Sequence, residues 1–338
     1  MSALELSTRL EAHEPPEVRG LGRDDVSLLV ATRGDGALVH ARFRDLPGFV
    51  RPGDLLVVNT SATLPAALDA RVGERPVELR LSTPVANENW VVELRTADRL
   101  PFRRPLAGSR LDLAGGGRAE LLAPYAGSDR LAVARLEVGG RVEDYLHRHG
   151  HPIRYAYVTR SWPLEAYQTI FAVEPGSAEM PSAGRPFTHE LVTDLIIGGV
   201  LVAPLTLHTG VSSPERDEPP YPERFRVPRE TLALVDAVHR WGGRVIAVGT
   251  TVVRALETAA APWDANDRRD GWTNLVVTPE RGLRLVDGLL TGWHEPESSH
   301  LQLLDAVAGA QLRERSYRAA LAHGYRWHEF GDVHLILP

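Results

Sequence analysis

The amino-acid sequence predicts an α/β fold into which a small all-β domain is inserted. From about Tyr157 onward, apolar strands alternate with amphipathic helices, which is typical of parallel βαβ units. In the middle of the chain, short alternating runs are separated by glycine and proline, as in a small barrel or sandwich. Strand patterns lie on both sides of this stretch. We therefore expect a main α/β domain from residues 1–68 and 150–338, with residues 69–149 forming the inserted domain.

The first strong strand signal follows a turn. Pro52-Gly53-Asp54 precedes the continuous apolar run 55–58, which predicts a buried strand. Asn59-Thr60-Ser61 comes directly after this run, and such residues favour turns and bonds from side chain to backbone. We expect the inserted domain to begin shortly afterwards.

The second half of the chain carries clear helix boundaries. Thr188 is a suitable N-cap for a helix that reaches residue 197, and Gly198-Gly199 ends it before an apolar strand at 200–207. A second amphipathic helix is predicted at 229–241, followed by a short buried strand at 245–248. Further helices are expected at 250–261 and 301–310.

Composition excludes several classes of protein. The chain has no cysteine, which excludes disulfides, thiolate zinc sites and a cysteine nucleophile. We expect no membrane span, because no apolar run approaches about 18 residues, and no secretory signal at the start, so a cytoplasmic protein is predicted. We also expect no metal site, since His147 and His149 lack an obvious third ligand. The net charge of −6 weighs against a large nucleic-acid-binding surface, although local arginine pairs keep an RNA substrate open.

Polar side chains follow two of the predicted strands. Parallel sheets place ligands at the carboxyl ends of their strands, against helix N-termini. His208 ends one strand, and its near-neutral pKa makes histidine a candidate acid–base group. Gly249-Thr250-Thr251 opens a helix whose free amides suit an anion, and Arg254 and Glu257 lie three apart on that helix. An ordinary capped helix with a surface ion pair explains the second group equally well.

Three further polar clusters have ordinary explanations when taken alone. His294, Glu297 and Ser298 precede a helix that a serine would cap. Tyr167-Gln168-Thr169 and Pro181-Ser182-Ala183-Gly184 read as turns. From the residues alone, the chain is an α/β enzyme with a small β insertion.

Taken together and in order, these motifs resemble the S-adenosylmethionine:tRNA ribosyltransferase-isomerase family of queuosine biosynthesis. The resemblance runs from Pro52-Gly53-Asp54 to Phe330-Gly331-Asp332. It is carried by the following motifs: Tyr167-Gln168-Thr169, Pro181-Ser182-Ala183-Gly184, Thr206-Leu207-His208, Val248-Gly249-Thr250-Thr251-Val252-Val253-Arg254 and Thr291-Gly292-Trp293-His294-Glu295-Pro296-Glu297-Ser298.

The resemblance implies a fold and a reaction. The fold is a barrel-like α/β domain with a small β-barrel inserted after the strand that ends at Asn59. The reaction moves the ribosyl part of S-adenosylmethionine to a 7-aminomethyl-7-deazaguanine in tRNA, giving epoxyqueuosine with release of adenine and methionine. It needs a base for a 5′-carbon proton, donors for the departing adenine, and exclusion of water. S-adenosylmethionine is a co-substrate, and no metal is implied.

The chain departs from the family pattern at several positions. Where the family has asparagine, threonine and arginine after Asn59, this chain has Thr60, Ser61 and Ala62, and Ala67 replaces the next arginine. Glycine-leucine-histidine-phenylalanine becomes Gly184-Arg185-Pro186-Phe187. Glycine-alanine-glycine-threonine-phenylalanine becomes Gly210-Val211-Ser212-Ser213-Pro214, and histidine-x-x-histidine-x-glutamate becomes Glu218-Pro219-Pro220-Tyr221-Pro222-Glu223. Three histidines and two arginines of the family pattern are therefore absent from their positions in this chain.

The resemblance also assigns candidate site residues. His208, His294 and Glu297 are expected to act in acid–base chemistry. The donor is expected to contact Tyr167, Gln168, Thr169, Gly249, Thr250, Thr251, Arg254 and Glu257, with Arg254 holding the methionine carboxylate and Glu257 orienting Arg254. The acceptor side is expected at Asn59, Ser182, Gly184 and Asp332.

The departures leave the acceptor open. One hypothesis is the family reaction on tRNA with a diverged acceptor pocket. A second keeps S-adenosylmethionine but uses a small-molecule acceptor, or fragments the donor. A third is a non-catalytic protein that binds a nucleoside. A monomer is expected in each case.

Overall fold

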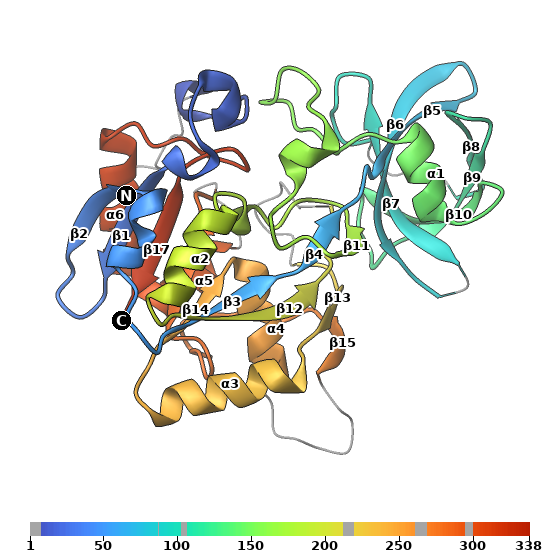
Figure 1. Ribbon diagram of the computed structural model, residues 1–338. Coiled ribbons are helices and arrows are strands. Elements are labelled where there is room, and N and C mark those ends of the chain that lie inside the picture. The colour runs from blue at the N-terminus through green and yellow to red at the C-terminus, as the bar shows by residue number, and fades with distance from the viewer. Residues whose placement is uncertain (1–7, 87, 103–106, 212–219, 261–268, 295–299) are drawn as a thin grey trace.

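The computed structural model describes residues 8–86, 88–102, 107–211, 220–260, 269–294 and 300–338. Its main body is built on a mixed, open sheet of nine strands (Figure 1). In order across the sheet these are β15 (Asp270–Thr273), β13 (Glu223–Arg226), β12 (Leu201–Leu207), β3 (Leu55–Asn59), β14 (Val245–Val248), β16 (Gly288–Gly292), β17 (Val333–Leu337), β1 (Ser27–Thr32) and β2 (Leu38–Arg42). The central strands β12, β3, β14 and β16 are parallel, whereas β17 runs antiparallel to β16.

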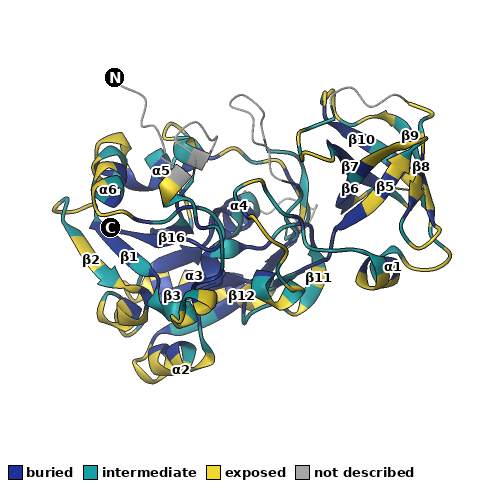
Figure 2. Cartoon of the chain, turned by 90° about the horizontal axis from the view of Figure 1, so that it is seen from above, coloured by how far each residue is buried: buried dark blue, intermediate teal, exposed yellow. Residues whose placement is uncertain are grey.

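Helices cover both faces of this sheet. Alternate residues of β3 point to opposite faces, as the period of a strand requires. Leu55 and Val57 pack with α3 (Arg229–Arg240), α4 (Thr250–Ala259), α5 (His300–Ala308) and α6 (Ala310–Ala322). Leu56 and Val58 pack against the other layer, which contains α2 (His189–Ile197). Figure 2 shows these central strands buried between the layers.

The inserted segment forms a closed barrel of six antiparallel strands, apart from the main sheet in Figure 1. Its strands are β5 (Ala67–Val72), β6 (Arg75–Pro84), β7 (Asn89–Thr96), β8 (Arg110–Leu113), β9 (Arg118–Pro124) and β10 (Leu131–Glu137), followed by α1 (Val142–His149). The barrel has its own apolar core, in which Leu79, Leu81 and Val92 are fully buried. The α/β class and the inserted β-barrel are confirmed. The domain boundaries at residues 69 and 149 stay a prediction.

Two short parallel strands connect the barrel to the main sheet. β4 (Ser61–Thr63) leads from β3 toward the barrel, and β11 (Glu174–Ser177) lies beside it. In Figure 1 this pair lies between the two bodies. The remaining short elements are the 3-10 helices η1 (Thr8–Leu10), η2 (Pro16–Arg19), η3 (Arg23–Asp25), η4 (Phe43–Gly48), η5 (Leu164–Tyr167) and η6 (Ser182–Gly184).

Most predicted elements occur where the sequence placed them. The Oγ1 of Thr188 accepts a hydrogen bond from the Leu191 amide at 3.1 Å, so the predicted N-cap of α2 is confirmed. Trp241 differs from the expectation of a buried helix face, because α3 ends at Arg240 and the indole, 55% exposed, donates to the Gly53 carbonyl. The predicted serine cap at 298–299 lies outside the described residues. Among the helices that are described, none has the length and apolar character needed to cross a membrane.

Candidate functional site

The predicted site residues gather at one edge of the main sheet. The parallel strands β12, β3, β14 and β16 all end there, at or just before His208, Asn59, Gly249 and His294. Because β17 runs antiparallel to β16, its start lies at the same edge and places Asp332 beside that end of β16. The register of the strands therefore brings together residues that lie up to 273 positions apart in the sequence, counting from 59 to 332.

Asn59 holds two parts of this edge together. Its Oδ1 accepts hydrogen bonds from the amides of Ser61 and Leu207, both at 3.0 Å. Its Nδ2 donates to the Leu207 carbonyl at 2.8 Å and to the Oγ1 of Thr251 at 3.4 Å. These four contacts use both donors and both acceptor positions of the amide. The structure thus gives Asn59 a role in positioning β12 and α4, and its contact with the acceptor stays a prediction.

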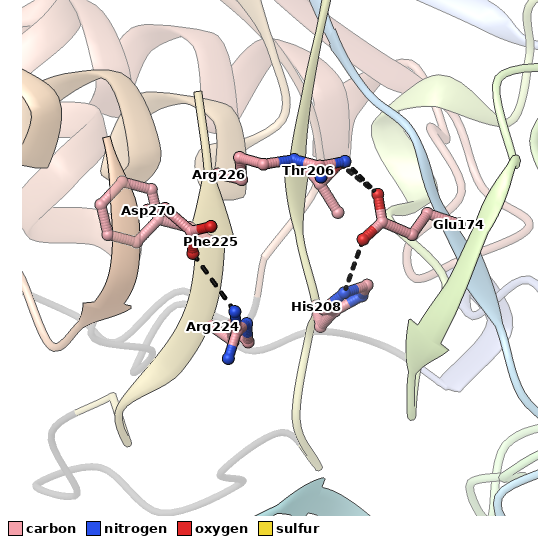
Figure 3. A pocket seen from close by; sticks show the side chains of 7 residues that line it. All are labelled: Glu174, Thr206, His208, Arg224, Phe225, Arg226 and Asp270. Carbon is pink, nitrogen blue, oxygen red and sulfur yellow. Dashed lines mark hydrogen bonds and ion pairs between the residues drawn. The ribbon is translucent and has the colours of Figure 1, made fainter. Parts of the chain in front are cut away.

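His208 lies in the strand junction between the barrel and the main sheet. Its Nδ1 is 2.7 Å from the Oγ of Ser61, and this Oγ is 2.6 Å from the Oγ of Ser177. Its Nε2 faces the Oε1 of Glu174 at 3.8 Å (Figure 3). Ser61 belongs to β4 and Glu174 to β11, so these two strands supply the neighbours of the two ring nitrogens.

Charged side chains line the pocket beside His208. It is lined by Glu174, Thr206, His208, Arg224, Phe225, Arg226 and Asp270. Glu174 accepts from Arg226 at 2.5 Å, and Arg224 lies 3.4 Å from Asp270 (Figure 3). Burial lowers the pKa of His208, and Arg224 and Arg226 lower it further, while Glu174 acts in the opposite direction. His208 is therefore held in its neutral form.

Gly176 sits directly against the imidazole of His208. A Cβ added at this position would overlap Nδ1, Cε1 and Cγ of the ring. Only glycine lets the β11 backbone approach so closely, so this residue sets the position of the ring.

The start of α4 faces a second predicted motif. Gly249 has a φ of 103° and precedes the helix, and its carbonyl accepts from the amides of Val252 and Val253. The first amides of a helix have no partner within it. A Cβ built on Gly249 would lie 3.5 Å from the Cβ of Ala183, so η6 packs against this turn. The structure thus brings the Pro181–Gly184 motif beside Gly249 and Thr250.

Arg254 and Glu257 do not pair with each other, and that expectation is wrong. Arg254 bonds to the carboxylate of Glu223 and to the carbonyls of Thr273 and Leu275, both at 3.2 Å. The carboxylate of Glu257, 1% exposed, is 2.9 Å from the Nη1 of Arg281. It also accepts from the backbone amides of residues 284, 285 and 286. The physical reason is that tertiary partners, Glu223 for Arg254 and Arg281 for Glu257, replace the neighbour one helical turn away.

The side chains of Tyr167, Gln168 and Thr169 also make contacts with other parts of the protein. The Gln168 side chain pairs with the backbone of Thr63, with its Oε1 2.9 Å from the amide and its Nε2 2.8 Å from the carbonyl. Tyr167 is buried against Phe330, with ring centroids 5.1 Å apart. The methyl group of Thr169 would lie 3.3 Å from a Cβ at Gly184. The motif supports β4 and η6, and contact with an adenine stays a prediction.

Three further predicted residues, His294, Asp332 and Ser182, lie at the rim of the same edge. The Nε2 of His294 is 2.9 Å from the Oγ1 of Thr291. The carboxylate of Asp332 accepts from the amides of Ser27 at 2.6 Å and Arg326 at 2.7 Å, which anchors the starts of β1 and β17. Ser182 is half-buried in η6. Glu297 lies outside the described residues.

Several residues at the site were missed by the sequence interpretation. Ser61, Glu174, Gly176, Ser177 and Glu223 were not selected as site residues. A signal existed for three of them, because Glu174-Pro175-Gly176-Ser177 lies between the Tyr167–Thr169 and Pro181–Gly184 motifs. Their contacts with His208 or with Ser61 depend on the pairing of β4 with β11, which no local pattern predicts. Among the described residues, no group of three histidines and carboxylates is arranged to hold a metal ion.

Comparison with known proteins identifies relatives along almost the whole chain. The family model described as "Queuosine biosynthesis protein" matches residues 3–336. An S-adenosylmethionine:tRNA ribosyltransferase-isomerase from Acidiphilium cryptum is 37% identical over 346 residues, covering 96% of this chain and 95% of the relative. One from Thermus thermophilus is 37% identical over 342 residues, covering 96% and 97%.

A solved structure supports the same relationship. The crystal structure of an S-adenosylmethionine tRNA ribosyltransferase from Thermotoga maritima has a TM-score of 0.55 and 28% sequence identity, and 99% of each chain is covered. The likeness therefore includes both the main sheet and the inserted barrel.

Proposed function

The chain belongs to the queuosine biosynthesis protein family, and from this premise we propose that it is an S-adenosylmethionine:tRNA ribosyltransferase-isomerase. It would transfer the ribosyl part of S-adenosylmethionine to a 7-aminomethyl-7-deazaguanine in tRNA and form epoxyqueuosine, with release of adenine and methionine. The observation that carries the proposal is the match over residues 3–336 together with the collection of the family's motifs at one sheet edge.

For the donor, we assign the start of α4. The amides of Thr250 and Thr251 face outward from the helix N-terminus, and the positive end of a helix stabilises a carboxylate such as that of methionine. Gly249, with a φ of 103°, lets the chain turn directly into this helix. Arg254 is already paired with Glu223, so we assign it a supporting role in holding α4 against β13.

For the chemistry, we assign His208 and His294 to the reacting end. Both follow strands of the parallel core, and His208 is held on each side by side chains of β4 and β11. The side chain of His208 is 16% exposed, and partial burial of the reacting group limits the access of water to a reactive sulfonium intermediate.

For the acceptor, we propose tRNA. Arg224 and Arg226 are each 55% exposed beside His208, and arginine suits the phosphates of a nucleic-acid backbone. The chain also has Pro186 in place of the family's histidine. The preceding residue, Arg185, is buried and paired with Glu17 at 3.0 Å. This change is the observation that favours a small-molecule acceptor as the second candidate.

One experiment separates these functions. The full chain is incubated with S-adenosylmethionine and tRNA carrying the 7-deazaguanine amine, and the products are analysed by mass spectrometry. Release of adenine with an epoxyqueuosine nucleoside supports the proposal. Adenine release without any RNA supports a small-molecule acceptor or fragmentation of the donor. Donor binding by calorimetry without adenine release under either condition contradicts an enzymatic function.

A further inference from the structure

Ser177, Ser61 and His208 form a row of hydrogen-bonded side chains. The two serine Oγ atoms are 2.6 Å apart, and the Oγ of Ser61 is 2.7 Å from the Nδ1 of His208. At the other end, the amide of Thr209 donates to the Oγ of Ser177 at 3.0 Å. Both serines are 0% exposed, so bulk solvent does not reach them. Each hydroxyl proton must therefore find its acceptor inside the row.

The geometry gives the row a direction. Ser177 accepts from the Thr209 amide, and in the described part of the chain its own proton has a single acceptor, the Oγ of Ser61. Ser61 then has its proton left for Nδ1 of His208, and every donor in the row is satisfied. In the opposite direction, the proton of one serine would be buried without an acceptor, which costs the full desolvation of that group.

From this we infer that the row holds neutral His208 with an unprotonated Nδ1 and a protonated Nε2, so that His208 donates a hydrogen bond to the substrate and is not the base. The inference rests on the proposed function for the identity of the substrate, but not for the tautomer. In a neutral imidazole one nitrogen is a donor and the other an acceptor, and the partner of one nitrogen decides the role of the other.

The surroundings of Nε2 agree with this assignment. Its neighbour, the Oε1 of Glu174, is 3.8 Å away, which is too long for a hydrogen bond. The other carboxylate oxygen is taken by Arg226 at 2.5 Å and by Thr206 at 3.3 Å. Burial and the two arginines of β13 lower the pKa of His208. A second proton, on Nδ1, would also require the whole row to reverse.

A hydrogen-bond donor at the position of Nε2 suits a particular class of acceptor atom. Nε2 can donate to a ring nitrogen of the departing adenine or to an oxygen of the ribose, where electron density rises as bonds break. The base that takes the 5′-carbon proton is then a different group. Ser61 and Ser177 do not touch the substrate in this arrangement; they are positioning residues that act through His208.

The tautomer is measured directly by nuclear magnetic resonance. Long-range proton–nitrogen spectra of the 15N-labelled full chain show whether each ring nitrogen is of the bare or the protonated type, and the variant His208→Gln identifies the signal. We expect a bare Nδ1 and a protonated Nε2 at neutral pH. A protonated Nδ1, or an imidazolium, overturns the inference.

Variants of Ser61 connect the tautomer to turnover. Ser61→Ala removes the donor to Nδ1, so the His208 signal is expected to move toward a mixture of tautomers while turnover falls roughly 10- to 100-fold. Ser61→Thr keeps the hydroxyl and is expected to restore both. Ser316→Ala, which changes another serine that is 0% exposed, controls for the loss of a buried hydroxyl in general. Loss of turnover in Ser61→Ala with an unchanged His208 signal overturns the positioning role.

The role of His208 as a hydrogen-bond donor has its own test. Glutamine can present an amide N–H near the position of Nε2, so His208→Gln is expected to retain more turnover than His208→Ala, which should lose about 10²–10⁴-fold. Equal losses in the two variants overturn the donor role. The spectra need no turnover, so absence of adenine release would count against the proposed function alone, and a wrong tautomer would count against this inference alone.

Discussion

Arg254 and Glu223 form an ion pair that joins the helix α4 to the strand β13. The two side chains are 10% and 14% exposed, and Arg254 also bonds to two carbonyls on the far side of its guanidinium. The second oxygen of Glu223 accepts from the amide of Gly210 at 3.0 Å. The pair therefore fixes the segment that follows His208 as well as the helix that opens at Gly249.

Removing the charge of Glu223 should destabilise the fold. Glu223→Gln leaves Arg254 buried without a counter-ion, and the expected loss is about 3 kcal/mol in the free energy of unfolding. Urea denaturation measures this loss. As a control, Asp270→Asn breaks the half-exposed pair with Arg224 and should cost about 1 kcal/mol or less.

The same variant tests the role of Arg254 in donor binding. If Arg254 only supports α4, the affinity of folded Glu223→Gln for S-adenosylmethionine stays close to that of the parent protein in calorimetry. A large change in affinity would show that Arg254 contacts the methionine carboxylate directly.

Gln168 should behave as a structural residue. Gln168→Glu removes the donor to the Thr63 carbonyl and places a carboxylate beside it, so we expect a loss of about 1–3 kcal/mol in the free energy of unfolding. Gln302→Glu, at an exposed position of α5, should change it by no more than about 0.5 kcal/mol. Weakened donor binding with unchanged stability would instead indicate contact with the adenine.

Adding one methyl group at Gly176 should impair turnover. In Gly176→Ala the Cβ overlaps the ring of His208, which must move away from Ser61. Misplacement of a reacting group by about 1 Å can cost on the order of 10²-fold in rate. Adenine release is the measurement, with Gly48→Ala as the control because nothing lies within 4 Å of a Cβ there. Parent-like turnover in Gly176→Ala would contradict the close fit.

The stability of the fold should fall in mild acid because of His334. This side chain is 0% exposed, stacks on Trp293 at 4.8 Å, and has no hydrogen-bond partner for either nitrogen among the described residues. Burial lowers its pKa to about 3. Between about pH 6.5 and pH 3 the unfolded chain binds this proton and the folded chain does not, so the free energy of unfolding decreases as the pH falls.

The contribution of His334 can be isolated with one variant. His334→Phe keeps the stacked ring and removes the titration, so the pH dependence should lose up to about 1.4 kcal/mol per pH unit in this range. Urea denaturation at several pH values measures it. An identical slope in the variant and the parent would contradict a neutral, buried His334.

Local patterns predicted most of the elements, because caps and periodicity act over a few residues. Thr188 begins α2 and Pro52-Gly53-Asp54 precedes β3, as expected. Partners distant in sequence could not be predicted. The bond between Ser61 and Ser177 spans 116 positions, and it forms only because β4 pairs with β11. Spacing alone suggested Glu257 as the partner of Arg254, whereas packing of β13 against α4 supplied Glu223.

The attachment of the barrel has a mechanical consequence. The two strands that join it to the main sheet, β4 and β11, also carry the two serines that orient His208. The orientation of His208 therefore depends on the pairing of β4 with β11, which lies between the barrel and the main sheet. A substitution that disrupts this strand pair is therefore expected to disturb the imidazole as well as the attachment of the barrel.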